Sequence, residues 1–193
     1  MKLWAVIIVL SELKLICEVN METLFALATR RSTREFLDTA IEPEKIKAIL
    51  SAGMSGPSAV NARPWEFIVI TDREKLLEMA EGNGRAANPL KSAPLGILVC
   101  GNLQKAYSGA PDYWTVDAAI ATQNMILAAH DLGVGSVWLG TYPQDNKMQA
   151  QREIFNLPEH IVPHSIVAFG YPKVEKCEER DLYDENKVHF GGW

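Results

Sequence analysis

The sequence contains a cluster of arginines that could bind an anion. In Arg30-Arg31-Ser32-Thr33-Arg34, three guanidinium groups lie within five residues. They repel one another unless an anion sits among them, and arginine forms paired hydrogen bonds with phosphate. The alternative is a solvated basic helix end, which the helix dipole favours. Taken alone, the segment favours this simpler interpretation.

A second candidate is the loop Gly56-Pro57-Ser58-Ala59-Val60-Asn61, which is followed closely by Arg63-Pro64-Trp65. It places many hydrogen-bond donors and acceptors directly before an apolar run. Ligand contacts concentrate on loops of this kind. The alternative is a plain connection between a helix and a strand.

A third candidate is the glycine-rich run from Gly133 to Gly140, whose spacing superficially resembles a dinucleotide-binding fingerprint. That fingerprint must follow a strand and open a helix, so that the pyrophosphate meets the helix N-terminus. Here the glycines follow a long helical pattern and open a strand. We therefore reject a Rossmann site and interpret Gly133 as a helix C-cap.

No metal site or protein nucleophile is expected. His160 and His164 are spaced four residues apart, but Pro163 lies between them and there is no HExxH motif. The cysteines are too far apart for a CxxC pair and are interpreted as buried or idle thiols; they are Cys17, Cys100 and Cys177. We therefore name no catalytic side chain, which suits an enzyme whose chemistry belongs to a bound organic cofactor.

The elements that must position these segments are short. Apolar periodicity predicts helices over residues 22–29, from Pro43 to about Gly53, and over residues 117–132. Thr71 to Glu74 fits a capping box that opens another helix. Short apolar runs predict strands over residues 65–70, 95–100, 134–140 and 165–170. Residues 103–114 are expected to be a loop or lid.

Strands separated by helices ordinarily suggest a doubly wound parallel sheet, but periodicity does not settle the direction of the strands. The helix over residues 117–132 is apolar nearly all round, which indicates burial in a core or an interface.

Composition limits the class of protein. With 193 residues, 48% of them hydrophobic and 22% charged, the chain suits one globular domain. A net charge of -5 argues against a general nucleic-acid binder. Leu3 to Leu10 is apolar but too short to span a bilayer, and no signal-peptide cleavage pattern follows it. Residues 1–20 are interpreted as an upstream extension, or else as an extra packed element, and residues 21–193 as the domain.

Together, the segments resemble the nitroreductase family of FMN-dependent NAD(P)H oxidoreductases. Residues 30–36 are similar to its opening RRSxRxF, and residues 57–65 to its PSxxNxQPW, with Arg63 where glutamine is more usual. Residues 132–140 match LGxGSxWxG, and residues 170–172 match GYP. The tail from Arg180 to Trp193 is like the ends of small members, although Glu178 stands where many have a second basic residue. The motifs run in the family's order from Met21 to the end.

The resemblance implies an α+β fold, in which a three-layer α/β/α sandwich surrounds a mostly antiparallel sheet, and an intertwined homodimer with FMN at the subunit interface. Arg34 would lie near N1 and O2 of the flavin ring, and the loop at residues 57–61 would come from the other subunit. The cofactor-binding residues expected on this basis are Arg30, Arg31, Ser32, Arg34, Pro57, Ser58, Ala59, Asn61, Trp138, Leu139, Gly140, Thr141 and Arg180.

The implied activity is a ping-pong transfer of electrons from NADH or NADPH, through FMN, to a nitroaromatic, a quinone or a similar organic acceptor, in the cytoplasm. Neither a membrane nor a nucleic acid is expected as a partner. Three alternatives remain open: a flavin-dependent reductive dehalogenase, a flavin-fragmenting enzyme on the same fold, and a non-catalytic FMN carrier or sensor.

Overall fold

A computed structural model describes residues 22–174 and 178–193. These residues form a four-stranded sheet of β1 (Trp65–Ile70), β2 (Leu95–Asn102), β3 (Gly135–Gly140) and β4 (Ile161–Gly170). The strand order is β1-β2-β4-β3, and every neighbouring pair is antiparallel. The antiparallel α+β fold implied by the resemblance is confirmed, and the parallel sheet suggested by strand–helix alternation alone is wrong.

The strand predictions were closest where breakers flank the apolar run. The bounds of β1 are those predicted, since Pro64 precedes the strand and a helix cap follows it. Strand β4 begins four residues earlier than predicted. Proline ordinarily argues against a strand interior, but Pro163 lies opposite Cys100, where the register with β2 shifts. The irregular pairing at this point accommodates it.

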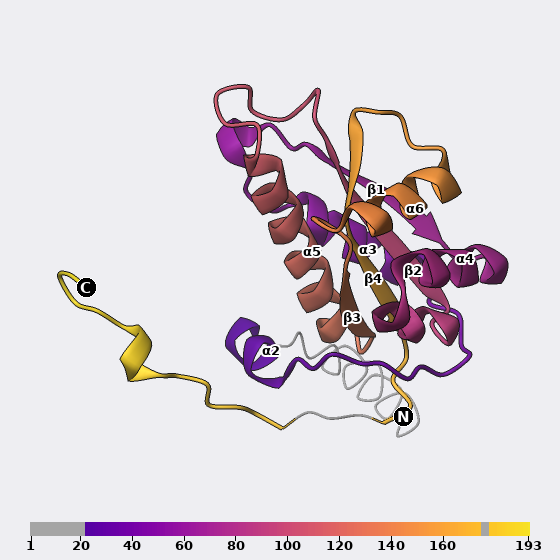
Figure 1. Ribbon diagram of the computed structural model, residues 1–193. Coiled ribbons are helices and arrows are strands. Elements are labelled where there is room, and N and C mark those ends of the chain that lie inside the picture. The colour runs from indigo at the N-terminus through magenta and orange to yellow at the C-terminus, as the bar shows by residue number, and fades with distance from the viewer. Residues whose placement is uncertain (1–21, 175–177) are drawn as a thin grey trace, which may run out of the picture.

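Helices cover both faces of the sheet (Figure 1). On one face lie α3 (Pro43–Met54) and α5 (Tyr113–Asp131), which pack against each other and surround a core that includes Ile49, Met125 and Phe169. On the other lie α4 (Arg73–Asn83), η2 (Arg85–Lys91) and α6 (Asp145–Phe155), over a core that includes Leu76 and Ile166. The three-layer arrangement is therefore confirmed.

Two helix boundaries differ from their predictions. Helix α4 is capped by Asp72, whose carboxylate accepts a hydrogen bond from Lys75 N at 2.9 Å. The expected cap at Thr71 is thus wrong by one residue. Helix α5 begins at Tyr113 rather than Asp117, so the last residues of the expected loop at 103–114 are helical. This shift leaves Asp117 one turn inside the helix, where it is buried.

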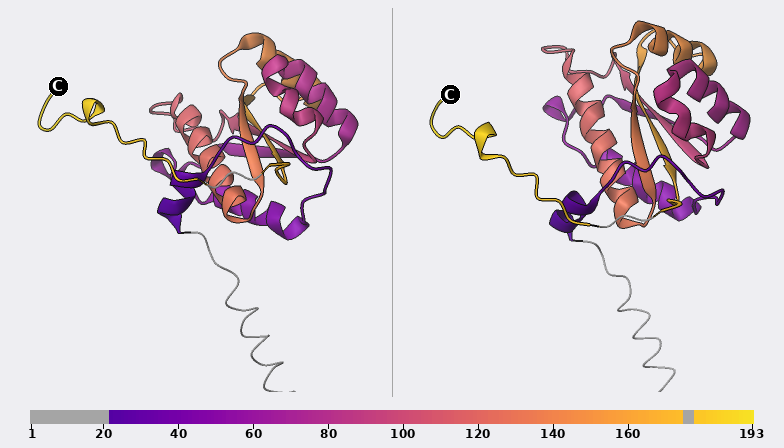
Figure 2. Two further views of the ribbon diagram at one scale, coloured as in Figure 1. Left: turned by 90° about the horizontal axis from the view of Figure 1, so that it is seen from below. Right: turned by 60° about the horizontal axis from the view of Figure 1, so that its bottom comes forward.

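The short helix α2 (Thr23–Thr29) lies beside the C-terminal end of α5, and the last residues run away from the body in every view (Figures 1 and 2). This tail contains η3 (Glu185–Lys187) and exposes Leu182, Tyr183, Phe190 and Trp193. The N-terminal extension expected over residues 1–20, with Cys17, and also Cys177 lie outside the described residues. Cys100 is a buried free thiol as expected, and burial raises its pKa to about 12.

Neither a membrane-crossing helix nor a metal centre is found in the described ranges. None of the helices there is both long and apolar enough to span a bilayer. The same ranges contain no cluster of three or more histidine, cysteine, aspartate or glutamate side chains that could bind a metal ion.

Candidate functional site

The arginine segment leaves α2 and runs along the open edge of β3. Thr33 N donates a hydrogen bond to Ser136 O at 2.9 Å, and Ser32 forms a parallel bridge with Ser136. This approach requires Gly135, because a Cβ there would lie only 2.7 Å from the Thr33 hydroxyl. Gly133 has the positive φ of +72° expected of a helix C-cap. Because Gly135 has no side chain, the arginine segment can pack directly against the edge of β3.

The guanidinium of Arg31 forms hydrogen bonds with backbone carbonyls. Its Nη1 donates to the carbonyls of Ala28 at 3.1 Å, Thr29 at 2.8 Å and Arg30 at 3.2 Å, and its Nη2 donates to Glu178 O. The guanidinium therefore joins the C-terminal end of α2 to the tail. Arg31 stays a predicted cofactor ligand, and its hydrogen bonds place both Nη atoms on backbone carbonyls.

Arg180 is brought from the far end of the sequence to Arg30. Its backbone N donates to Ala28 O at 3.3 Å, and its Nη2 donates to Arg30 O at 2.9 Å. Its Nε is buried and finds no hydrogen-bond partner in the part of the chain that the structure describes. Within the described ranges no carboxylate lies within ion-pair distance of Arg30 or Arg180. The two arginines form a cationic cluster with an unused donor.

The positive charges of this cluster shift the pKa of Arg30. Partial burial lowers the pKa of Arg30, and the nearby positive charges of Arg180 and Arg31 lower it further. An anion placed among these arginines would offset the repulsion between their positive charges and accept a hydrogen bond from the unused Nε of Arg180. The cluster is therefore suited to bind a phosphate group.

His130 borders the same cluster and is not among the residues predicted from the sequence. The Thr29 hydroxyl donates to Phe25 O at 2.7 Å and lies 2.8 Å from His130 Nε2. Because the single hydroxyl hydrogen is given to Phe25 O, Nε2 must be the donor to Thr29. Burial lowers the pKa of His130, with contributions from Arg30 and Arg31. In the sequence, His130 stands only as a basic residue at the end of an apolar helix.

The predicted loop at residues 57–61 holds an unusual backbone conformation. It contains η1 (Ala59–Asn61), with positive φ at Val60 (46°), Asn61 (59°) and, just beyond, Arg63 (51°). Positive φ is strained for a β-branched residue such as Val60. Ser58 Oγ accepts from Arg63 N at 2.9 Å, and Arg63 Nε donates to Asn61 Oδ1 at 2.8 Å. Pro57 and Asn61 are exposed, while Ser58 and Ala59 are half-buried.

At the end of β3 the four predicted residues divide into two pairs. Leu139 and Thr141 are buried, and the Thr141 hydroxyl donates to Asn83 Oδ1 at 2.9 Å. Trp138 and Gly140 are exposed. Since Ser136 O faces the open edge, alternation along the strand directs the N–H groups of residues 138 and 140 to that edge as well. The edge therefore presents backbone donors close to the arginine segment.

Trp138 belongs to an aromatic cluster that sequence spacing did not reveal. Its indole lies edge-on to His164 at 5.8 Å, and His164 also contacts the rings of Trp114 at 5.8 Å and Tyr142 at 6.3 Å. Burial lowers the pKa of His164 to about 4, so its imidazole is neutral at pH 7. Nδ1 of His164 lies 3.1 Å from Ser165 Oγ. The His164 ring thus packs against Trp138.

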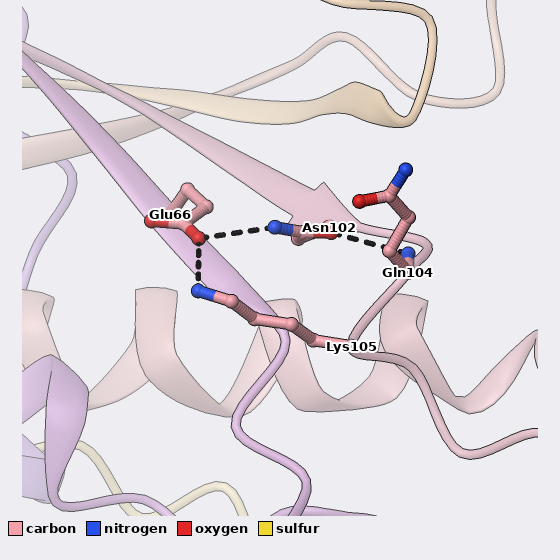
Figure 3. Close-up of polar contacts among 4 residues, drawn as sticks. All are labelled: Glu66, Asn102, Gln104 and Lys105. Atoms are coloured by element: carbon pink, nitrogen blue, oxygen red, sulfur yellow. Dashed lines mark hydrogen bonds and ion pairs between the residues drawn. The ribbon is translucent and has the colours of Figure 1, made fainter.

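Contacts are made at both ends of the loop after β2, and Figure 3 shows those at its beginning. Lys105 Nζ lies 2.6 Å from Glu66 Oε1, which also accepts from Asn102 Nδ2 at 3.2 Å. The hydrogen bond from Lys105, above all, lowers the pKa of Glu66. At the other end Trp114 covers Gly101, where a Cβ would lie 2.1 Å from the indole. Both ends of the loop therefore contact the sheet.

Two of the predicted segments lie at opposite ends of α5. The arginine cluster lies beside His130, near the C-terminal end, and the loop at residues 57–61 contacts Asp117, near the N-terminal end. At about 1.5 Å per residue, Asp117 and His130 are about 20 Å apart along the helix. Figure 1 shows α2 and this loop at the two ends of α5. One chain does not bring the two groups together.

Comparisons with known proteins decide the family. The profile described as "Nitroreductase family" matches residues 27–87 and 81–171, most of the chain. This chain belongs to the nitroreductase family. The resemblance drawn from the sequence motifs is thereby confirmed, and with it the class of enzyme, an oxidoreductase.

Individual nitroreductase-family proteins match over nearly their whole length. A protein from Methanothermobacter thermautotrophicus named "Putative NADH dehydrogenase/NAD(P)H nitroreductase" is 43% identical, covering 90% of this chain and 89% of its own. A crystal structure under the same name from Parabacteroides distasonis has a TM-score of 0.82 at 38% identity, covering 89% of this chain and 99% of its own.

A solved structure named FMN-dependent nitroreductase, from Clostridium difficile, has a TM-score of 0.81 at 32% identity, and the match covers 88% of this chain and 99% of that one. Together with the family profile, these structural matches confirm the nitroreductase fold.

Proposed function

We propose that this protein binds FMN and transfers electrons from NADH or NADPH to an organic acceptor by a ping-pong mechanism. Family membership and the names of its relatives, which include FMN and NAD(P)H, support the cofactor and the electron donor. We propose nitroaromatics or quinones as acceptors, and the cytoplasm as the place of action. The observation that carries the proposal is the cationic cluster of Arg30 and Arg180.

The donors in this cluster fit the phosphate of FMN. Arg180 supplies a buried Nε without a partner, and Arg30 supplies a guanidinium that lacks a carboxylate within the described ranges. Ser32 adds an exposed hydroxyl nearby in the chain. A dianionic phosphate would accept these hydrogen bonds and offset the repulsion between the two arginines. Arg31 would hold the segment in place through its contacts with carbonyls.

The edge of β3 would hold the flavin ring. Gly140 O already accepts hydrogen bonds from Asn83 Nδ2 at 3.2 Å and Lys147 Nζ at 3.1 Å, which fix the end of the strand. The N–H groups of residues 138 and 140 would face the ring. Arg34 is exposed, and its Nη1 donates to Ser32 O at 3.2 Å, which leaves further donors for the ring.

When bound, FMN supplies the redox chemistry, accepting a hydride from the nicotinamide and passing electrons to the acceptor. The protein's residues bind and orient it. A guanidinium at Arg34 near N1 and O2 would stabilise the negative charge that develops there on reduction. Neutral His164 would keep Trp138 in place beneath the ring without adding a charge. A proton donor or acceptor from the protein is not needed.

We further propose a homodimer in which each FMN contacts both chains. The two predicted groups lie about 20 Å apart along α5, so the loop at residues 57–61 of a second chain would complete the site. Apolar side chains available for such an interface are exposed on α2, at Leu24 and Leu27, and on the tail, at Phe190 and Trp193.

An anaerobic stopped-flow experiment tests the proposal. Mixing the FMN-loaded protein with NADH or NADPH should bleach the flavin, and a nitroaromatic or quinone added afterwards should restore its colour. A flavin that binds but is not reduced by either nicotinamide would instead indicate a carrier or sensor. Reduction followed by halide release from a halogenated acceptor, or by breakdown of the flavin itself, would favour a dehalogenase or a flavin-fragmenting enzyme. A protein that does not bind FMN would refute the proposal.

A further inference from the structure

Asp117 is a buried carboxylate on α5 that points at the loop at residues 57–61. Only 3% of its surface is exposed. Its Oδ1 accepts a hydrogen bond from Ala59 N at 2.9 Å, and its Oδ2 is buried without a hydrogen-bond partner among the described residues. A buried carboxylate is costly, so its presence calls for a specific reason.

Helix α5 holds the loop along one stripe of side chains. Asn124 Nδ2 donates to Ala52 O at 3.2 Å at the end of α3, and Ile120 packs so closely on Gly56 that a Cβ there would lie 2.8 Å from its Cγ2. Asp117 comes next along the same face of the helix. These three contacts follow the chain from α3 into η1, and Asp117 makes the last of them.

The position of this last contact matters because the strained backbone begins directly after it. Ala59 receives the Asp117 contact, and Val60 and Asn61 then adopt positive φ. Such conformations persist only where surrounding contacts determine them. The other side-chain contacts of the turn join Ser58, Asn61 and Arg63 to one another within the loop itself. Asp117 supplies the anchor from the body of the protein.

We infer that Asp117 is a positioning residue for the flavin-binding loop: its Oδ1 fixes Ala59 and thereby the conformation of residues 60–61. This inference rests on the proposed function. Since Oδ2 has no partner within residues 22–174 and 178–193, the role falls to the hydrogen-bond acceptor at Oδ1 and not to a pairing of the negative charge. Asparagine retains a side-chain oxygen in the position of Oδ1, whereas alanine does not.

The experiment compares FMN affinity and backbone protection in Asp117→Asn and Asp117→Ala. Asp117→Ala should weaken FMN binding about tenfold or more and speed amide hydrogen exchange over residues 59–63, since one buried hydrogen bond is lost. Asp117→Asn should stay within about threefold of the wild type in both. Asp117→Leu, which fills the space without an acceptor, replaces Asp117→Ala should the smaller side chain unfold the chain.

Gln151→Ala is the matched control, because Gln151 is also fully buried with an unpartnered oxygen, but lies on α6 across the sheet. It should lower the melting temperature and leave FMN affinity unchanged. An Asp117→Asn variant as defective as Asp117→Ala would overturn the inference, as would an Asp117→Ala variant with unchanged loop exchange. Hydrogen exchange is measured on the protein without FMN, so a wild type that fails to bind FMN would refute the proposed function and leave this test intact.

Discussion

Replacing Arg180 should weaken FMN binding without destabilising the protein. Among the residues that the structure describes, its guanidinium donates to Arg30 O and offers a buried Nε with no partner. We expect the phosphate to take this donor. Losing one charge-assisted hydrogen bond costs about 1.5–3 kcal/mol, which corresponds to a rise of about 10- to 150-fold in the dissociation constant.

Replacing Arg180 should not lower the stability of the protein without FMN. The positive charge of Arg180 contributes to the lowered pKa of Arg30, so its removal relieves repulsion. In Arg180→Gln, the melting temperature without FMN should be unchanged or slightly raised, and the increase that FMN produces should be smaller. Differential scanning fluorimetry over a range of FMN concentrations measures both quantities.

Two controls make this prediction specific. Riboflavin lacks the phosphate, so its affinity should be the same for Arg180→Gln and for the wild type. Arg73→Gln removes a guanidinium that also donates to backbone carbonyls, those of Leu90 and Lys91, but on the opposite face of the sheet. It should leave FMN affinity unchanged. Equal losses of riboflavin and FMN affinity in Arg180→Gln would refute the assignment of Arg180 to the phosphate.

Three further predictions follow from the site and the fold. Arg34→Gln should lower the flavin reduction potential and slow hydride uptake about 10²–10³-fold while oxidised FMN stays bound. Arg30→Gln should weaken FMN affinity with little change in the reduction potential. A spectroelectrochemical titration that finds the potential of Arg34→Gln unchanged would contradict this division of roles. The pKa of His164 is about 4 in the folded protein and about 6.5 in the unfolded chain, so between these pH values only the unfolded chain gains a proton. The free energy of unfolding should therefore fall by up to about 3 kcal/mol as the pH drops from 6.5 to 4. In urea unfolding, His164→Phe should lack this part of the pH dependence, and an unchanged dependence would count against it. A chain beginning at Met21 should fold and bind FMN as the full chain does, and a large fall in its melting temperature would show that residues 1–20 belong to the core.

The sequence predicted the four strands and most of the helices because their signals are local, but it missed α6. The limits of β1 follow from its flanking breakers, and the C-cap at Gly133 follows from the end of an apolar helix. Asp117 shows where local signals mislead. It resembles a helix start in the sequence, yet α5 begins at Tyr113 and buries this carboxylate against the loop at residues 57–61.

The contacts within the site were harder to predict because they join distant parts of the chain. The engagement of Arg31 depends on Glu178 O, 147 residues away, and the unpaired donor of Arg180 becomes visible only once the tail lies against α2. His164 contacts Trp138 because β3 and β4 are neighbours in the sheet, and spacing along the sequence does not encode that pairing. Residue types indicated the candidate ligands, and the fold showed which donors remain available.

The crystal structure of the FMN-loaded protein is the most direct test of the central claim. The proposed site predicts the phosphate between the guanidinium groups of Arg30 and Arg180 in one protomer, the ring along the edge of β3, and residues 57–61 supplied by a second protomer. A phosphate bound away from Arg30 and Arg180, or a single chain that contacts one FMN through both its arginine cluster and its own residues 57–61, would contradict it.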